Sequence, residues 1–150
     1  HPRTLEGRVK LAKLDFLVRY PRHLATILDA RGLRTAEHVA LLEQDSPLES
    51  RMMRYRYGPW DPSYFAVLGS LVGRGLVQAI PAEGSSAIGY RTTEQGEQLA
   101  RRLSEDGAFD ELIQRITLVR RHLDLTGENL KRLVYTLPEV ADATWHQELL

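Results

Sequence analysis

The chain has 150 residues, of which 43% are hydrophobic and 27% are charged, so it can bury a core and is not a disordered polypeptide. Its 20 basic side chains balance 20 acidic ones, whereas a protein that binds nucleic acid alone usually carries a basic excess. It contains no cysteine, which excludes disulfides, thiolate metal sites and cysteine nucleophiles.

Neither a signal peptide nor a membrane-spanning pattern is present, so we expect a cytoplasmic protein that contacts no membrane. The chain opens at His1 without a methionine, as expected of a fragment that lacks its native start. We expect one compact unit in three parts. These are N-terminal helices over 1–50, a central domain over 51–107 and C-terminal helices over 108–150.

Three helices are predicted in the first part of the chain. The first runs from Leu5 to Tyr20 and ends where Pro21 begins the second, because a residue before proline avoids helical angles. Gly32 is expected to cap the second helix. The third begins near Thr35 and ends at Asp45.

The central part begins ambiguously and then gives a strong helix signal. Residues 51–57 fit either a short strand or a last helical turn, and Gly58–Trp60 is predicted to be a turn. Asp61 followed by Pro62 is a good helix start, so we predict a helix from Pro62 to Gly73. We expect it to bury Tyr64, Phe65, Leu68, Leu71 and Val72.

A β-hairpin is predicted next. Two short apolar runs, Leu76–Ile80 and Ala87–Arg91, flank a segment rich in proline, glycine and serine, whose tip is expected at Glu83–Ser86. Thr92 or Thr93 is predicted to cap the helix that follows.

Two amphipathic helices, Ala108–Leu123 and Thr126–Leu137, are predicted near the C-terminus, and Pro138 is expected to stop the second. The tail is predicted to form a short helix around Trp145. The two long helices carry more apolar residues than a small domain needs. We therefore predict that they do not both satisfy their apolar faces within the chain, and that an exposed patch serves as a docking surface.

The order of elements from Asp61 to Leu103 resembles the wing region of winged helix-turn-helix proteins such as MarR- and PadR-type regulators. The matching residues are Arg74–Val77 and Tyr90–Gly96, although Thr92 stands where leucine is usual. Gly96 is expected to permit close approach to a neighbouring strand. The resemblance implies a mainly α protein with a small β-wing, in which N- and C-terminal helices flank a winged helix-turn-helix core.

In winged helix-turn-helix proteins the helix before the wing is the recognition helix, and the helix that begins at Pro62 takes this position here. It is poor in side chains that read DNA bases. Base reading relies on Arg, Lys, Asn or Gln, and its outward stripe offers only Arg74. A smooth strip of small residues beside that stripe would let another helix approach closely, or would pack inside the domain. The candidate partner interface comprises Ala66, Val67, Gly69, Ser70 and Gly73.

A basic-aromatic run is the best nucleic-acid candidate, because arginines contact phosphates and tyrosines stack on bases. The alternative is a surface strand with salt bridges to Glu49 or Asp61. We expect weak, salt-dependent DNA binding without sequence preference. The candidate nucleic-acid contacts are Arg51, Arg54, Arg56, Arg74 and Arg91.

Catalytic chemistry finds no support in the sequence. The five histidines show no metal-ligand spacing, the glycines form no phosphate-binding loop, and no nucleophile elbow is present. We therefore predict no catalytic residue, no metal site and no cofactor.

Three segments narrow the resemblance further: Lys13–Pro21, Met53–Trp60 and Leu125–Val140. Together they resemble the middle component of bacterial ABC-three-component systems, including Lamassu-type antiphage defence. The resemblance implies a small non-catalytic adaptor that joins an SMC- or Rad50-like ATPase to an effector, often a nuclease. The alternative is a DNA-binding transcriptional regulator, dimeric through its terminal helices. The segment from Ile80 to Tyr90 carries no basic residue, which favours the adaptor.

Overall fold

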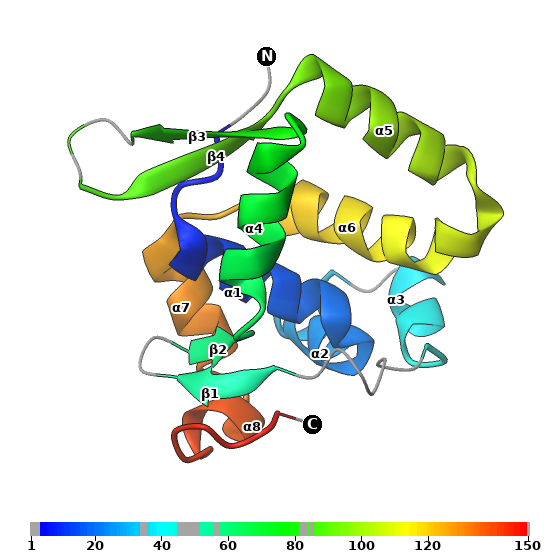
Figure 1. Ribbon diagram of the computed structural model, residues 1–150. Coiled ribbons are helices and arrows are strands. Elements are labelled where there is room, and N and C mark those ends of the chain that lie inside the picture. The colour runs from blue at the N-terminus through cyan, green and yellow to red at the C-terminus, as the bar shows by residue number, and fades with distance from the viewer. Residues whose placement is uncertain are drawn as a thin grey trace.

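The computed structural model describes residues 4–33, 36–44, 52–55, 58–81, 84 and 86–149, and it is mainly helical with two small antiparallel sheets (Figure 1). The helices are α1 (Arg8–Arg19), α2 (Pro21–Ala30), α3 (Ala36–Leu41), α4 (Tyr64–Gly73), α5 (Glu94–Glu105), α6 (Asp110–His122), α7 (Gly127–Val134) and α8 (Pro138–Ala141), with a short 3-10 turn, η2 (Gly107–Phe109), before α6. The strands are β1 (Met53–Tyr55), β2 (Gly58–Trp60), β3 (Val77–Pro81) and β4 (Ile88–Thr92).

Helix α1 is the centre of the core, and α2, α6, α7 and strand β2 contact it (Figure 1). Phe16 and Leu17 on α1 are fully buried between these neighbours. We call this group of elements, with α3, α8 and β1, the body. Its buried apolar side chains form one cluster, which includes Leu24, Ile27, Leu28, Leu41, Met52, Leu123, Leu130, Val134, Val140 and Leu149.

In the described part of segment 51–57, Met53–Tyr55 is a strand, β1, and not a helical turn, and the turn predicted at Gly58–Trp60 is wrong. Gly58–Trp60 is the strand β2, which pairs antiparallel with β1. The helix predicted around Trp145 is also wrong. The C-terminal segment instead runs beside β1, where the Leu149 amide donates to the Met52 carbonyl at 2.8 Å. This long-range pairing satisfies backbone groups that a tail helix would have satisfied locally.

The buried hydroxyl of Tyr20 holds the same junction together. It donates to the Leu149 carbonyl at 2.8 Å and accepts from the Met52 amide at 2.9 Å. Because Tyr20 lies between α1 and α2, one side chain connects the first helix pair, the entry to β1 and the C-terminal segment.

Helix α7 ends at Val134, so Pro138 does not stop it and is the first residue of α8. The expectation that the two long C-terminal helices lack cover is wrong for α7, whose Leu130 and Val134 are buried. The other predicted helix, Ala108–Leu123, is in part uncovered: Phe109 in η2 and Ile116 in the middle of α6 are exposed. The larger uncovered surface lies elsewhere in the molecule.

The body buries one lysine without full compensation, which predicts a pH-dependent stability. Burial, and then the nearby charge of Lys131, lower the pKa of Lys13 to about 8. The unfolded chain therefore holds more protons between about pH 8 and 10.5, and this group makes stability rise with pH across that window. Below pH 8 the cost of burying the charge is fully present.

We expect Lys13→Met to increase the free energy of unfolding at pH 7 by about 1–3 kcal/mol. The gain over wild type should shrink as pH rises from 8 to 10.5. Denaturant unfolding at several pH values measures this difference, and Arg22→Met on the exposed side of α2 controls for loss of a helical cation. A gain that is constant across the window would contradict the prediction.

Candidate interaction surface

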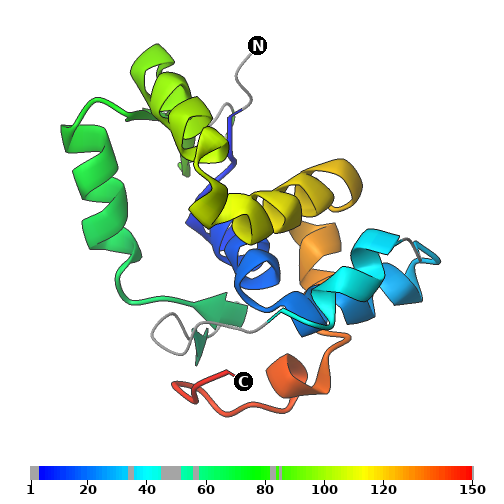
Figure 2. The ribbon, with the colours of Figure 1, turned by 90° about the vertical axis from the view of Figure 1, so that its right-hand side faces the viewer.

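Helix α4, the β3–β4 hairpin and α5 form an arm that leaves the body and returns to it through η2 (Figure 2). Of the apolar side chains that α4 was predicted to bury, only Tyr64 is buried. Leu68 and Leu71 are half-buried, whereas Phe65 is 61% exposed and Val72 is also exposed. The prediction is wrong because α4 meets the body only near its first turn and then stands away from it (Figure 2).

A charged and aromatic clamp joins the arm to the body. Arg19 on α1 contacts the Asp15 carboxylate at 2.7 Å and the Asp61 carboxylate at 2.6 Å. The Tyr64 hydroxyl donates to Asp15 at 2.6 Å, and the Trp60 ring lies edge-on to the Tyr64 ring at 5.0 Å. We call Asp15, Arg19, Asp61 and Tyr64 the clamp.

Electrostatics keep the clamp in one protonation state. Burial raises the pKa of Tyr64, and the Asp15 carboxylate raises it further, so the hydroxyl stays a donor. Burial opposes ionisation of Asp61, but hydrogen bonds from Ser63 and Arg19 prevail and lower its pKa. Asp61 also accepts from the Ser63 amide at 2.8 Å, which turns the chain into α4 two residues later than predicted.

The strand pairing of the predicted hairpin is confirmed, with Val77 opposite Thr92 and Ile80 opposite Gly89. Of its predicted tip, Glu83–Ser86, residues Glu83 and Ser85 lie outside the described residues. Thr93, one of the two expected caps, starts α5: its hydroxyl oxygen accepts from the Gly96 amide at 3.0 Å. A Cβ atom at Gly96 would collide with the carbonyl of Leu76, the residue just before β3, so the close approach expected of Gly96 is made to the entry of that strand.

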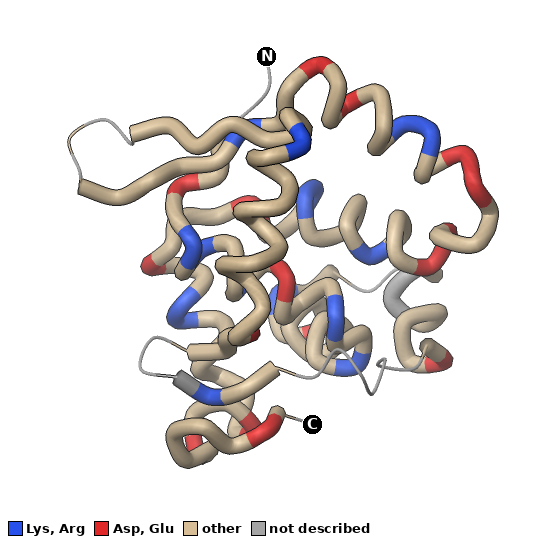
Figure 3. Tube along the Cα trace, viewed as in Figure 1, with Lys and Arg blue, Asp and Glu red and all other residues tan. Residues whose placement is uncertain are grey.

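The five candidate interface residues on α4 are all exposed: Ala66, Val67, Gly69, Ser70 and Gly73. A Cβ atom at Gly69 or Gly73 would meet nothing within 4 Å, so these small residues do not serve packing within the described chain. Helix α4 and strand β3 carry no charged residue, as Figure 3 shows. An exposed helix of this composition is unusual, because surface helices normally present charged residues to solvent.

The candidate nucleic-acid contacts do not form one described surface. Arg54 is only 8% exposed, so its expected role is wrong; its Nε donates to the Val140 carbonyl at 3.1 Å and its guanidinium covers the Tyr135 ring. Arg74 is exposed at the end of α4. Arg91 is exposed on β4, where it donates to the Thr4 hydroxyl at 2.8 Å. The remaining two, Arg51 and Arg56, lie outside the described residues.

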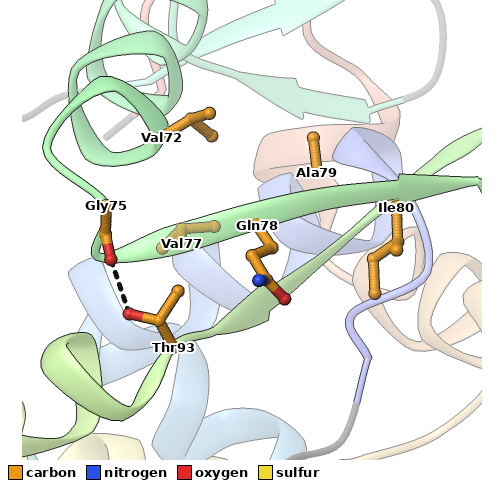
Figure 4. Close-up of a pocket in the computed structure, with 7 residues that line it drawn as sticks. All are labelled: Val72, Gly75, Val77, Gln78, Ala79, Ile80 and Thr93. Carbon is orange, nitrogen blue, oxygen red and sulfur yellow. Dashed lines mark hydrogen bonds between the residues drawn. The ribbon is translucent and has the colours of Figure 1, made fainter.

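A hollow of about 680 Å³ lies between the end of α4 and β3 (Figure 4). In Figure 4 Val72 and Ala79 lie on one side of the β3 ribbon, and Gln78 and Ile80 on the other. None of its lining residues is charged; they are Val72, Gly75, Val77, Gln78, Ala79, Ile80 and Thr93.

Comparisons with protein-family models, curated proteins and solved structures find no match to this chain. Among the described residues, no group of His, Cys, Asp or Glu could hold a metal ion. Within the same ranges, every helix is too short or too polar to cross a membrane. The arm is therefore the feature of the described chain from which a function can be argued.

The buried position of Arg54 predicts a role in stability. Truncation to alanine removes the hydrogen bond to Val140 and the contact with Tyr135, and it leaves a cavity. We expect Arg54→Ala to lower the free energy of unfolding by about 2 kcal/mol or more, and Arg74→Ala to change it by less than about 0.5 kcal/mol. Denaturant unfolding checks both variants, and equal effects would contradict the assignment of Arg54 to the core.

Proposed function

We propose that the protein is a non-catalytic adaptor subunit that joins an SMC- or Rad50-like ATPase to an effector in a bacterial antiphage defence complex in the cytoplasm. The observation that supports this proposal best is the uncharged, exposed face of α4, where Val67 is 49% exposed and Gly69 and Gly73 leave open space. A large apolar surface on a soluble chain usually marks a protein interaction site.

In the proposed adaptor, the body supplies the stable fold and the arm supplies the surface that binds a partner. The body buries most of the core, to which the arm adds Tyr64 and the half-buried Leu68 at the base of α4. The arm exposes apolar side chains of α4 and α5, including Val67 and Leu103. We propose that one subunit of the complex covers this arm.

A winged helix-turn-helix is the fold we propose for the arm with its neighbours. The order of α4, hairpin and α5 supports it, and so does the single β-bridge between Leu5 and Tyr90 on the far side of β4. The alternative function, a DNA-binding regulator, would use α4 to read bases. We prefer the adaptor because α4 carries no Arg, Lys, Asn or Gln between Tyr64 and Gly73.

Affinity capture of the tagged protein from its native cell, followed by mass spectrometry, tests the proposal. We expect an ATPase and an effector to be recovered with the wild type. Val67→Glu and Gly73→Glu should each reduce that recovery at least about tenfold, because they bury a charge in the interface. Val39→Glu is the matched control, since Val39 is 60% exposed on the body.

Unchanged thermal unfolding of all three variants would show that recovery reports on contact and not on folding. Capture of no ATPase, or equal recovery with both arm variants, would contradict the adaptor. Tight binding of the purified chain to one defined DNA site at physiological salt would support the regulator instead.

A further inference from the structure

Strand β3 is an open edge of the arm's sheet. β4 lies between β3 on one side and Leu5 on the other, where Leu5 and Tyr90 exchange amide-to-carbonyl hydrogen bonds of 2.8 and 2.9 Å. Within the part of the chain that the structure describes, β3 pairs with β4 alone. An edge strand carries a row of backbone groups that another chain can bind.

The ladder determines which groups of β3 point outward. Residues opposite each other in an antiparallel pair alternate between exchanging hydrogen bonds and not doing so. The Thr93 amide donates to the Leu76 carbonyl at 3.1 Å, so this pair is of the bonded kind. The alternation then turns the amides and carbonyls of Val77 and Ala79 away from β4, toward the open edge.

Among the described residues, this edge lacks most of the usual protection against pairing. Natural edge strands are guarded by charged side chains, proline, bulges or a covering element. Strand β3 has no charged residue and no bulge in its register with β4, and Pro81 stands only at its end. The uncharged hollow of about 680 Å³ lies along the same strand and has the size of a ligand pocket.

We propose that the β3 edge binds an extended, uncharged segment of a partner chain by β-strand addition. The amides and carbonyls of Val77 and Ala79 form four hydrogen bonds with the added strand, and its alternate apolar side chains enter the hollow beside Val72. The added strand would belong to the partner that covers the arm in the proposed function. Strand addition depends on the proposed function only because it requires such a partner.

A free segment fits this edge better than a second copy of the chain. The hollow has room for several side chains, and an extended partner segment can fill it with large apolar groups. A second β3 would bring its central residues Val77, Gln78 and Ala79, whose small or polar side chains fill little of that volume. The lining carries no charge that would select a charged segment.

The test uses the purified chain and a synthetic probe, an acetylated and amidated peptide of alternating threonine and leucine. Amide hydrogen exchange, followed by NMR, should slow at least about tenfold at Val77 and Ala79 when the peptide is added at millimolar concentration. A peptide of the same sequence with N-methyl groups on one edge should give no such protection, because it cannot pair.

The variant Ala79→Pro provides the matched test on the protein side. It removes an amide that the β3–β4 ladder does not use, so the chain should keep its thermal stability within a few degrees and yet lose peptide binding at least about tenfold. If this variant does not fold, the N-methylated peptide alone decides the question.

Equal binding of both peptides, or no change at Val77 and Ala79, would overturn strand addition. Protection of these amides that depends on protein concentration without peptide would show that a second copy takes the edge, and would also overturn the proposal. These outcomes are independent of the capture experiment. Strand addition can therefore fail while the adaptor function stands, and the reverse can also occur.

Discussion

Arg19 lies between two carboxylates that come from different parts of the chain, Asp15 in its own helix and Asp61 at the start of the arm. This contact sets the direction in which α4 leaves the body, because Asp61 also turns the backbone into that helix through the Ser63 amide. Tyr64 completes the arrangement by donating to Asp15. A partly buried network of this kind is strong only while every member keeps its partner, since a lone buried charge is costly. The clamp therefore fixes the base of the arm, and the pairing of Leu5 with Tyr90 holds the hairpin at its other end.

Beyond the clamp, the arm meets the rest of the chain at small contacts: the Arg8 guanidinium lies over the Phe65 ring at 4.5 Å, and Leu5 pairs with Tyr90. Figure 2 shows α4 standing apart from the helices around α1, and the side chains of α5 are exposed except near Gly96. Free energy of folding therefore comes mainly from the body, whose cluster around Phe16 and Leu17 is closed. The arm contributes little to the free energy of folding. Its uncovered apolar surface can therefore contribute to the free energy of binding a partner.

Local signals in the sequence predicted the elements of the arm well. Glycine and threonine at defined positions, such as Thr93 and Gly96, dictate turns and caps that depend only on near neighbours. Burial could not be predicted in the same way, because the apolar content of α4 has the same pattern whether the body or a partner covers it. The pairing of Met53 with Glu148 was missed for a related reason: it joins segments far apart in the chain. Arg54 was misjudged because basic residues are usually exposed, whereas its guanidinium covers Tyr135.

The central claim is that a self-sufficient body carries a weakly packed arm through the clamp. Native-state hydrogen exchange of the isolated chain tests it most directly, because it reports the free energy of opening for each segment. The account predicts that the amides of α1 and α7 exchange only through global unfolding. Amides of α4 and α5 should open several kcal/mol more easily, and Asp61→Asn should widen that gap. Exchange of α4 and α5 at the same free energy as α1 would show that arm and body unfold as one unit, and would contradict the account.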